Sequence, residues 1–275
     1  MQKLVEQHWD YTKHAKFYEF RPNYADVTID MLISLVRGHA HAAGGGQSFL
    51  VADIGAGTGN LSIMLLERGL KVVAVEPNDA MREIGIERTK NSAIEDVDSN
   101  VNFENNIEWV RATGVDSTLK SGEYDWVTFG SSFNVMDRNE ALKEAHRLLK
   151  PQRYFSCMWN HRDLHDPIQE IAEEVILELV PNYNRGVRRE DQRPILEQNK
   201  ELFDNIIYIE SDFYFHQSID NYISAWKSVK NPYWDLETID GMELFEKIAY
   251  QMRHRLPSHF NIKYTTRCWS AKKVG

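Results

Sequence analysis

The sequence is poor in cysteine: Cys157 and Cys268 are the only two among its 275 residues. Two cysteines so far apart argue against a disulfide-stapled extracellular fold, and they exclude an iron–sulfur cluster that needs several clustered thiolates. The first residues, from Met1 to Trp9, contain no apolar stretch typical of a secretory signal. We therefore expect two reduced, buried thiols in a cytoplasmic protein.

Long apolar runs and excess positive charge are also missing. No stretch approaches the roughly 18 apolar residues that a membrane-spanning helix needs, and the net charge is −9. Duplex nucleic acid and anionic membranes both demand a basic surface, so neither is expected as the main partner. His161 and His165 have a spacing found in metal sites, but no third ligand is fixed by the sequence, so no metal is expected.

What is present suits an ordinary globular protein. The chain is 42% hydrophobic and 27% charged, which is typical of globular domains. Its length is enough for one domain with an elaborated face or an added cap. We expect a monomer or a homodimer that acts on a small molecule.

The most informative stretch runs from Phe49 to Asn60. An apolar run ends near Asp53, glycines follow at Gly55, Gly57 and Gly59, and a helical pattern begins just after them. This order predicts a strand, a tight turn and a helix N-terminus, where glycine lets a ligand lie against the backbone.

A second apolar run, Lys71 to Val75, ends at Glu76. An acidic residue at the tip of the second strand is placed to accept hydrogen bonds from a ribose diol. A dinucleotide fold would carry a glycine at the sixth position of its G-x-G-x-x-G pattern, where this chain has Asn60. That difference counts against a NAD-dependent oxidoreductase.

The order D-I-G-A-G-T-G followed by V-E-P resembles the S-adenosyl-L-methionine (SAM) site of class I methyltransferases. The resemblance covers roughly residues 8 to 273. It implies an α/β fold with a Rossmann-like seven-stranded sheet, SAM as the cofactor, an N-terminal helical lid and a helical cap insertion. We expect the lid over residues 1–46, the SAM-binding core over 47–163, the cap over 164–205, and the last strands of the core over 206–275.

The same resemblance implies which residues surround the cofactor. The glycine loop passes under the methionine part of SAM, Glu76 binds the ribose hydroxyls, and lid residues meet the methionine carboxylate. The expected set is Tyr18, Arg21, Asp53, Gly55, Ala56, Gly57, Gly59, Glu76, Pro77, Met81, Thr113, Gly114, Val115, Ser131, Ser132 and Phe133. Val115 stands where the family usually has an acid, so the adenine contact there is expected through the backbone alone.

Candidates for acceptor binding and catalysis lie near the predicted strand ends. Tyr11, Tyr18, Asn134 and His161 are the candidate bases or orienting groups, although Asn134 stands in the loop where related sequences often have a histidine. Most lid aromatics are expected to pack as ordinary core. The predicted acceptor contacts are Trp9, Asn134, Trp159, Arg185 and Trp226.

Arg185 belongs to a group of arginines, Arg185 to Arg193, whose guanidinium forks match a carboxylate or phosphate. A solvated face partly paired with Glu190 and Asp191 is the alternative interpretation.

The function expected from these patterns is methyl transfer to a nitrogen or oxygen of a small molecule, by in-line displacement at SAM. The C-terminal half resembles methyltransferases of bacterial secondary metabolism, such as the azapteridine N-methyltransferases of toxoflavin-type pathways. A protein or nucleic-acid methyltransferase is the alternative, although Gly130-Ser-Ser-Phe133 differs from the [D/N/S]-P-P-[Y/F] element of amino-directed DNA enzymes. A non-catalytic SAM-binding module also remains open.

Overall fold

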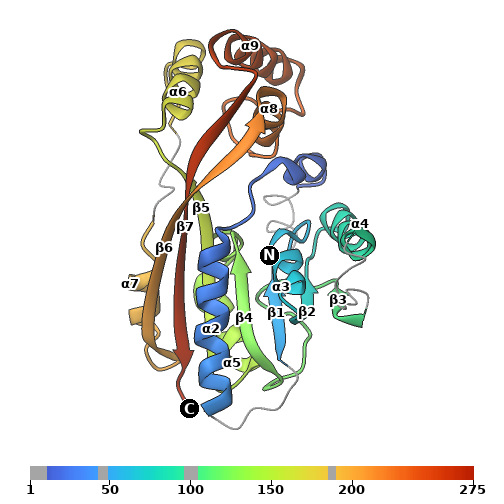
Figure 1. Ribbon diagram of the computed structural model, residues 1–275, viewed down its shortest axis with the longest axis vertical. Coiled ribbons are helices and arrows are strands. Elements are labelled where there is room, and N and C mark those ends of the chain that lie inside the picture. The colour runs from blue at the N-terminus through green and yellow to red at the C-terminus, as the bar shows by residue number, and fades with distance from the viewer. Residues whose placement is uncertain (1–10, 43–48, 96–104, 185–189) are drawn as a thin grey trace.

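A computed structural model describes residues 11–42, 49–95, 105–184 and 190–275. In this part of the chain a seven-stranded sheet has the order β3-β2-β1-β4-β5-β7-β6 (Figure 1). Strands β1 to β5 run parallel to one another, and β7 is antiparallel to both β5 and β6. The predicted seven-stranded α/β fold is confirmed. The strands are β1 Leu50–Ile54, β2 Lys71–Val75, β3 Ile107–Val110, β4 Tyr124–Gly130, β5 Leu149–Arg162, β6 Phe203–Ser218 and β7 His259–Lys273.

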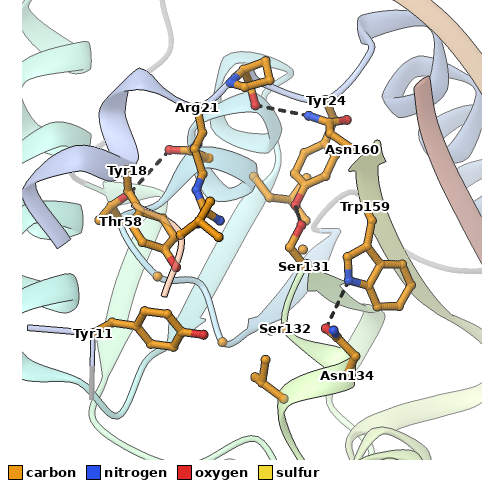
Figure 2. Close-up of a pocket in the computed structure, with 18 of the residues that line it drawn as sticks. Tyr11, Tyr18, Arg21, Tyr24, Thr58, Ser131, Ser132, Asn134, Trp159 and Asn160 are labelled. Carbon is orange, nitrogen blue, oxygen red and sulfur yellow. Dashed lines mark hydrogen bonds between the residues drawn. The ribbon is translucent and has the colours of Figure 1, made fainter. Parts of the chain in front are cut away.

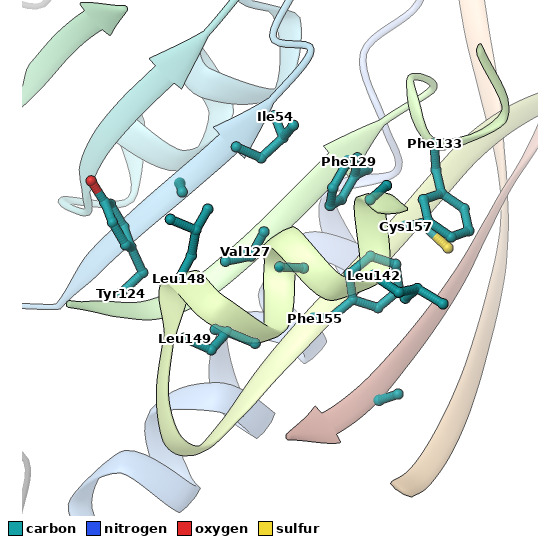
Figure 3. Close-up of a cluster of buried hydrophobic side chains, with 14 of the residues drawn as sticks. Ile54, Tyr124, Val127, Phe129, Phe133, Leu142, Leu148, Leu149, Phe155 and Cys157 are labelled. Carbon is teal, nitrogen blue, oxygen red and sulfur yellow. The ribbon is translucent and has the colours of Figure 1, made fainter. Parts of the chain in front are cut away.

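Helices cover both faces of the sheet, which is why the central parallel strands are continuous apolar runs rather than alternating ones. On one face α2 (Asp26–Ala42) and α3 (Asn60–Glu67) pack on a buried cluster that includes Val51, Trp126 and Met158. On the other face α5 (Arg138–Leu148) and α7 (Arg193–Gln198) pack on a cluster built around Phe129 and Phe155 (Figure 3). Helix α4 (Asp79–Glu95) flanks the β3 edge.

Polar side chains define where several helices begin. Asp137 accepts hydrogen bonds from two backbone N–H groups at the start of α5, and Asp166 accepts one from Ile168 ahead of α6 (Pro167–Leu179). Ser218 and Thr238 do the same for α8 (Ile219–Lys227) and α9 (Ile239–Arg255). Such caps satisfy donors that the first helical turn leaves unpaired.

The cap is built from α6, α8 and α9 together with the outer parts of β6 and β7 (Figure 1). The structure therefore divides the chain differently from the predicted boundaries. Of the two described helices in the predicted 164–205 insertion, α6 joins the cap, whereas α7 packs against β6 beside the sheet. Helix α2, placed in the predicted lid, is a sheet-covering helix.

We give the name lid segment to Tyr11–Tyr24, the described part of the predicted lid that precedes α2. This segment contains a turn followed by a 3₁₀ helix, Ala15–Phe20. Arg21 then adopts an extended conformation, with φ −76° and ψ 143°, because a residue that precedes proline is disfavoured in the helical region. The segment therefore leaves the helix at Arg21 and crosses toward the sheet.

Both cysteines are fully buried thiols in the paired strands β5 and β7, as expected. Within the described ranges, no helix is both long enough and apolar enough to traverse a lipid bilayer. The same residues contain no cluster of three or more His, Cys, Asp or Glu side chains arranged to hold a metal ion.

Candidate cofactor and acceptor site

A cavity of about 570 Å³ lies beyond the carboxyl ends of the parallel strands. Ligands of open α/β sheets bind in this position. The glycine loop after β1, the tips of β2 and β4, the lid segment and the inner side of the cap all contribute to its wall. Figure 2 shows lid residues Tyr11, Tyr18 and Arg21 on one side, with Ser131, Asn134 and Trp159 on the other.

The glycine loop has a backbone that side chains would disrupt. Gly55, Gly57 and Gly59 have φ values of +68°, +60° and +83°, in the left-handed region that glycine adopts without steric cost. A Cβ on Gly55 would lie 2.5 Å from the Cβ of Ser132. The bare backbone at Gly55 and Gly57 lines the cavity, whereas Gly59 begins α3 and faces Trp109.

Glu76 ties the loop to the tip of β2. Its Oε2 accepts a hydrogen bond from the Gly57 N–H at 2.9 Å, and its Oε1 accepts one from the Asn78 N–H at 2.8 Å. Each carboxylate oxygen can accept a further bond, and the residue lines the cavity. Burial raises the pKa of this carboxyl. The arrangement fits the predicted contact with a ribose diol.

Asp53 has a different role from the one predicted, although it reaches the cavity wall. It is fully buried, and its two oxygens accept hydrogen bonds from the hydroxyls of Ser62, at 2.6 Å, and Thr128, at 3.0 Å. Burial raises the pKa of Asp53 to about 6. Its carboxylate therefore fixes β1 against α3 and β4, behind the loop that faces the ligand.

The lid segment brings three predicted residues to the cavity. The Arg21 guanidinium stacks on the Tyr18 ring at 3.9 Å, and Tyr11 lies edge-on to Tyr18. Burial raises the pKa of both Tyr11 and Tyr18. Both phenols are consequently protonated at neutral pH, which suits them to donate hydrogen bonds and orient a ligand rather than to remove a proton.

Tyr24 was not predicted as a site residue, yet it lines the cavity and its hydroxyl lies 3.0 Å from the Ser131 hydroxyl (Figure 2). Ser131 itself has a φ of +61°. Ser132 also lines the cavity, and its hydroxyl donates to the Ile54 carbonyl. These contacts hold the turn after β4 against the glycine loop.

Several other predicted cofactor residues do line the cavity, namely Ala56, Pro77, Met81 and Gly114. Three do not. Phe133 is completely buried and packs against Phe129 and Phe155, so it supports the β4 turn from beneath. Thr113 bonds to the backbone of Asp116, and Val115 is an exposed residue outside the cavity wall.

The acceptor end of the cavity lies near the tip of β5. Trp159 donates through Nε1 to the Asn134 side-chain oxygen at 3.1 Å, so these two predicted residues orient each other (Figure 2). His161 is 8% exposed, and Trp226 from α8 is 2% exposed; both line the wall. Trp9 and Arg185 lie outside the described residues.

Sequence reasoning missed the residues that the end of β5 and the cap contribute. The strand extends to Arg162, so Asn160 and Arg162 lie on a paired strand rather than in the predicted loop. Asn160 donates to the Asn23 backbone oxygen and thereby anchors the lid segment. The cap adds Gln169, Glu173, Tyr183 and Tyr264 to the wall, and Gln192, the residue before α7, adds another side chain. Alternation along β5 could have indicated Asn160 and Arg162, but no local signal identified the residues outside that strand.

The sheet order, the glycine loop and the acidic β2 tip define the fold and site of a class I SAM-dependent methyltransferase. Comparison with known proteins agrees with this. Residues 52–157 match the family described as "Methyltransferase domain". A putative type II methyltransferase from Anaeromyxobacter dehalogenans has the same fold, with a TM-score of 0.50 at 14% identity over 92% of this chain and 97% of that one. The YcgJ protein of Bacillus subtilis also has a TM-score of 0.50, at 15% identity over 87% and 98% of the two chains.

Curated relatives match over the same region. An uncharacterized methyltransferase of Mycobacterium tuberculosis is 29% identical over 144 residues, which is 52% of this chain and 48% of the relative. A ubiquinone/menaquinone biosynthesis C-methyltransferase of Cronobacter sakazakii is 24% identical over 144 residues, 51% of this chain and 54% of the relative. The match thus spans about half the length of these relatives.

The chain has the fold of class I methyltransferases, and its residues 52–157 match a methyltransferase domain, a class whose cofactor is SAM. The cavity fits this cofactor: the glycine loop offers bare backbone, Glu76 offers acceptors for the ribose, and Arg21 offers a cation for the methionine carboxylate. When bound, SAM supplies an electrophilic methyl group on a sulfonium.

Proposed function

We propose that the protein methylates a nitrogen or oxygen atom of a small molecule, in the same cavity that holds SAM. The observation that carries the proposal is the size and lining of this cavity. The lid segment and the cap both contribute to its wall, and the acceptor end is lined by side chains from β5, α6 and α8. A pocket of about 570 Å³ is in the range that takes small molecules.

Direct contacts between the lid segment and the cap also support a small acceptor. Arg21 donates through Nε to the Ser228 hydroxyl at 2.7 Å and through Nη2 to the Ser228 carbonyl at 2.8 Å. His14 Nδ1 lies 2.8 Å from the Lys227 carbonyl oxygen. These bonds join the lid segment to the cap beside the cavity, an arrangement that favours a small acceptor over a protein or a nucleic acid.

The alignment of the acceptor with the methyl group is the main task of the protein, since proximity and orientation can supply as much as ~7–11 kcal/mol. Trp159 and Asn134 orient each other at the acceptor end, and Tyr24 and Ser131 hold the turn beside it. His161 is the candidate that removes a proton from a hydroxyl acceptor. A neutral ring nitrogen needs no such base before it attacks.

A screen of small acceptors tests the proposal. Nitrogen heterocycles and phenols are incubated with SAM, formation of S-adenosylhomocysteine (SAH) is measured, and NMR identifies the methylated atom. We expect turnover with a nitrogen or oxygen acceptor. His161→Gln should then lower kcat for a phenol by ~10²–10⁴-fold and leave a ring nitrogen acceptor nearly unaffected. His216→Gln, at an exposed histidine on β6, is the matched control.

Methylation of carbon is the main competing outcome, since one relative carries the name of a C-methyltransferase. A product methylated at carbon would refute the choice of nitrogen or oxygen and keep the small-molecule assignment. Turnover only with a protein or a nucleic acid would refute both.

A further inference from the structure

Arg162 is a cation at the acceptor end of the cavity that neither the predictions nor the methyl-transfer scheme uses. It is the last residue of β5 and pairs with Tyr264 of β7. Its guanidinium carbon lies 4.0 Å from the centre of the Trp226 ring and 5.6 Å from that of Tyr222. Its Nε donates a long hydrogen bond, 3.4 Å, to the Tyr264 hydroxyl. The residue lines the cavity.

This guanidinium has no carboxylate partner among the described residues. The carboxylates that also line the cavity at this end have other partners: Glu190 is held by both terminal nitrogens of Arg138, and Glu173 accepts from Gln169 Nε2 at 2.7 Å. Asp163, the next residue along the chain, pairs with Lys263. A guanidinium removed from bulk water without an anion is costly unless something pairs with it.

The wall beside Arg162 offers a second donor without an acceptor. Trp226 Nε1 is buried and has no hydrogen-bond partner in the part of the chain that the structure describes. Its neighbour Tyr222 lies edge-on, and the Tyr222 hydroxyl donates to Gln169 instead. A buried donor left unpaired carries a desolvation penalty. Both groups at this wall therefore lack an acceptor of negative character.

Stacking on Trp226 preorganises the Arg162 side chain for binding. The Trp226 ring restricts the guanidinium plane, so less side-chain freedom is lost when a ligand binds. The remaining edge of the guanidinium presents paired N–H groups, whose spacing matches the two oxygens of a carboxylate or phosphate. Arg162 lies three residues after Trp159 on β5. One small molecule can therefore extend from an anion held by Arg162 to the acceptor end near Trp159 and Asn134.

We propose that Arg162 forms an anion subsite, and that the methyl acceptor carries a carboxylate or phosphate which binds there while another part of the molecule faces SAM. This inference rests on the proposed function of the same cavity. The predicted contact of Arg185 lies outside the described residues and stays a separate prediction.

Binding of matched probe pairs to the protein saturated with SAH tests the subsite. The probes are 4-hydroxybenzoate against 4-hydroxybenzamide for a carboxylate, and phenyl phosphate against phenol for a phosphate. Calorimetry should find tighter binding of the acid in at least one pair. Arg162→Met should lower the affinity for that acid by about 10- to 100-fold, as expected for hydrogen bonds to a charged group. Its affinity for the neutral partner should stay within about twofold of wild type.

Two further variants keep the result interpretable. Lys247→Met removes the same charge from an exposed position on α9, and acid binding should not change in it. Arg162→Lys keeps the charge without the fork, and an intermediate loss is expected; it also serves if Arg162→Met does not fold.

The possible failures are distinguishable. If wild-type protein does not bind SAH, the proposed function fails. If SAH binds but no pair favours its acid, or no acid binds at all, the anion subsite is refuted while the methyltransferase assignment stands. Equal losses in Arg162→Met and Lys247→Met would also refute it, because the effect would then reflect net charge alone.

Discussion

Replacement of Glu76 by alanine should weaken SAH binding sharply without unfolding the protein. The two carboxylate oxygens each accept one backbone N–H, from Gly57 and Asn78, and each retains capacity for one ribose hydroxyl. Hydrogen bonds to a charged group contribute about 1.5–3 kcal/mol each. Loss of two such bonds predicts an affinity decrease of ~10²–10⁴-fold.

Stability should respond much less than affinity, because the two effects of the substitution on folding oppose each other. The variant leaves two backbone N–H groups without their acceptor, but it also removes a buried carboxylate whose pKa is raised by burial. Glu76→Gln should fall between wild type and alanine, since its amide keeps one acceptor oxygen and turns an N–H group toward another donor. Calorimetric titration with SAH and thermal unfolding of the same samples give both quantities.

Glu83→Ala is the matched control, because Glu83 is an exposed residue on the neighbouring α4. Its SAH affinity should equal that of wild type. The affinity of wild type should itself fall as pH is lowered through the raised pKa of Glu76, since protonation removes acceptor capacity. Retention of SAH affinity within about threefold in Glu76→Ala would refute the ribose assignment.

Three further outcomes are expected. Gly55→Ala should abolish measurable SAH binding and lower the melting temperature, because the left-handed backbone and the turn after β4 leave no room for a Cβ. Since the pKa of Asp53 rises from 3.8 to about 6 on folding, the folded state keeps this proton where the unfolded chain loses it, so stability falls as pH rises across that window. In urea unfolding, the free energy of unfolding of Asp53→Asn should fall less than that of wild type across this pH window, by at most about 3 kcal/mol. The exposed Asp204→Asn should match wild type. Ser228→Ala should raise the KM for SAM more than it lowers kcat, because it removes one bond that holds Arg21 at the cavity; an unchanged KM would contradict that role.

Much of the fold could be predicted because each central strand carries its own signal. The strands β1, β2 and β4 are apolar on both faces, and a glycine or an acidic residue ends each at the ligand side. The glycine loop and Glu76 were predictable for the same reason: their chemistry is local, and the backbone conformation of Gly55 and Gly57 is possible for few other residues.

Other features depend on contacts between distant segments. β6 is one strand from Phe203 to Ser218, because its pairing with β7 continues past the bulge near Asp204. Phe133 could not be distinguished from a cavity residue, since the direction of its ring is set by Phe129 and Phe155. Arg162 acquires its surroundings only when α8 packs over the end of β5.

The lid segment shows how these distant contacts join the two halves of the cavity. It lies outside the matched domain, residues 52–157, yet it bonds to both sides: Thr12 accepts from Asn78 Nδ2 beside the ribose position, and Arg21 donates to Ser228 in the cap. A movement of the lid segment would therefore break contacts with the cap, which also lines the acceptor end. Binding of the two ligands should for this reason be coupled, with SAH increasing the affinity of an acceptor rather than leaving it unchanged.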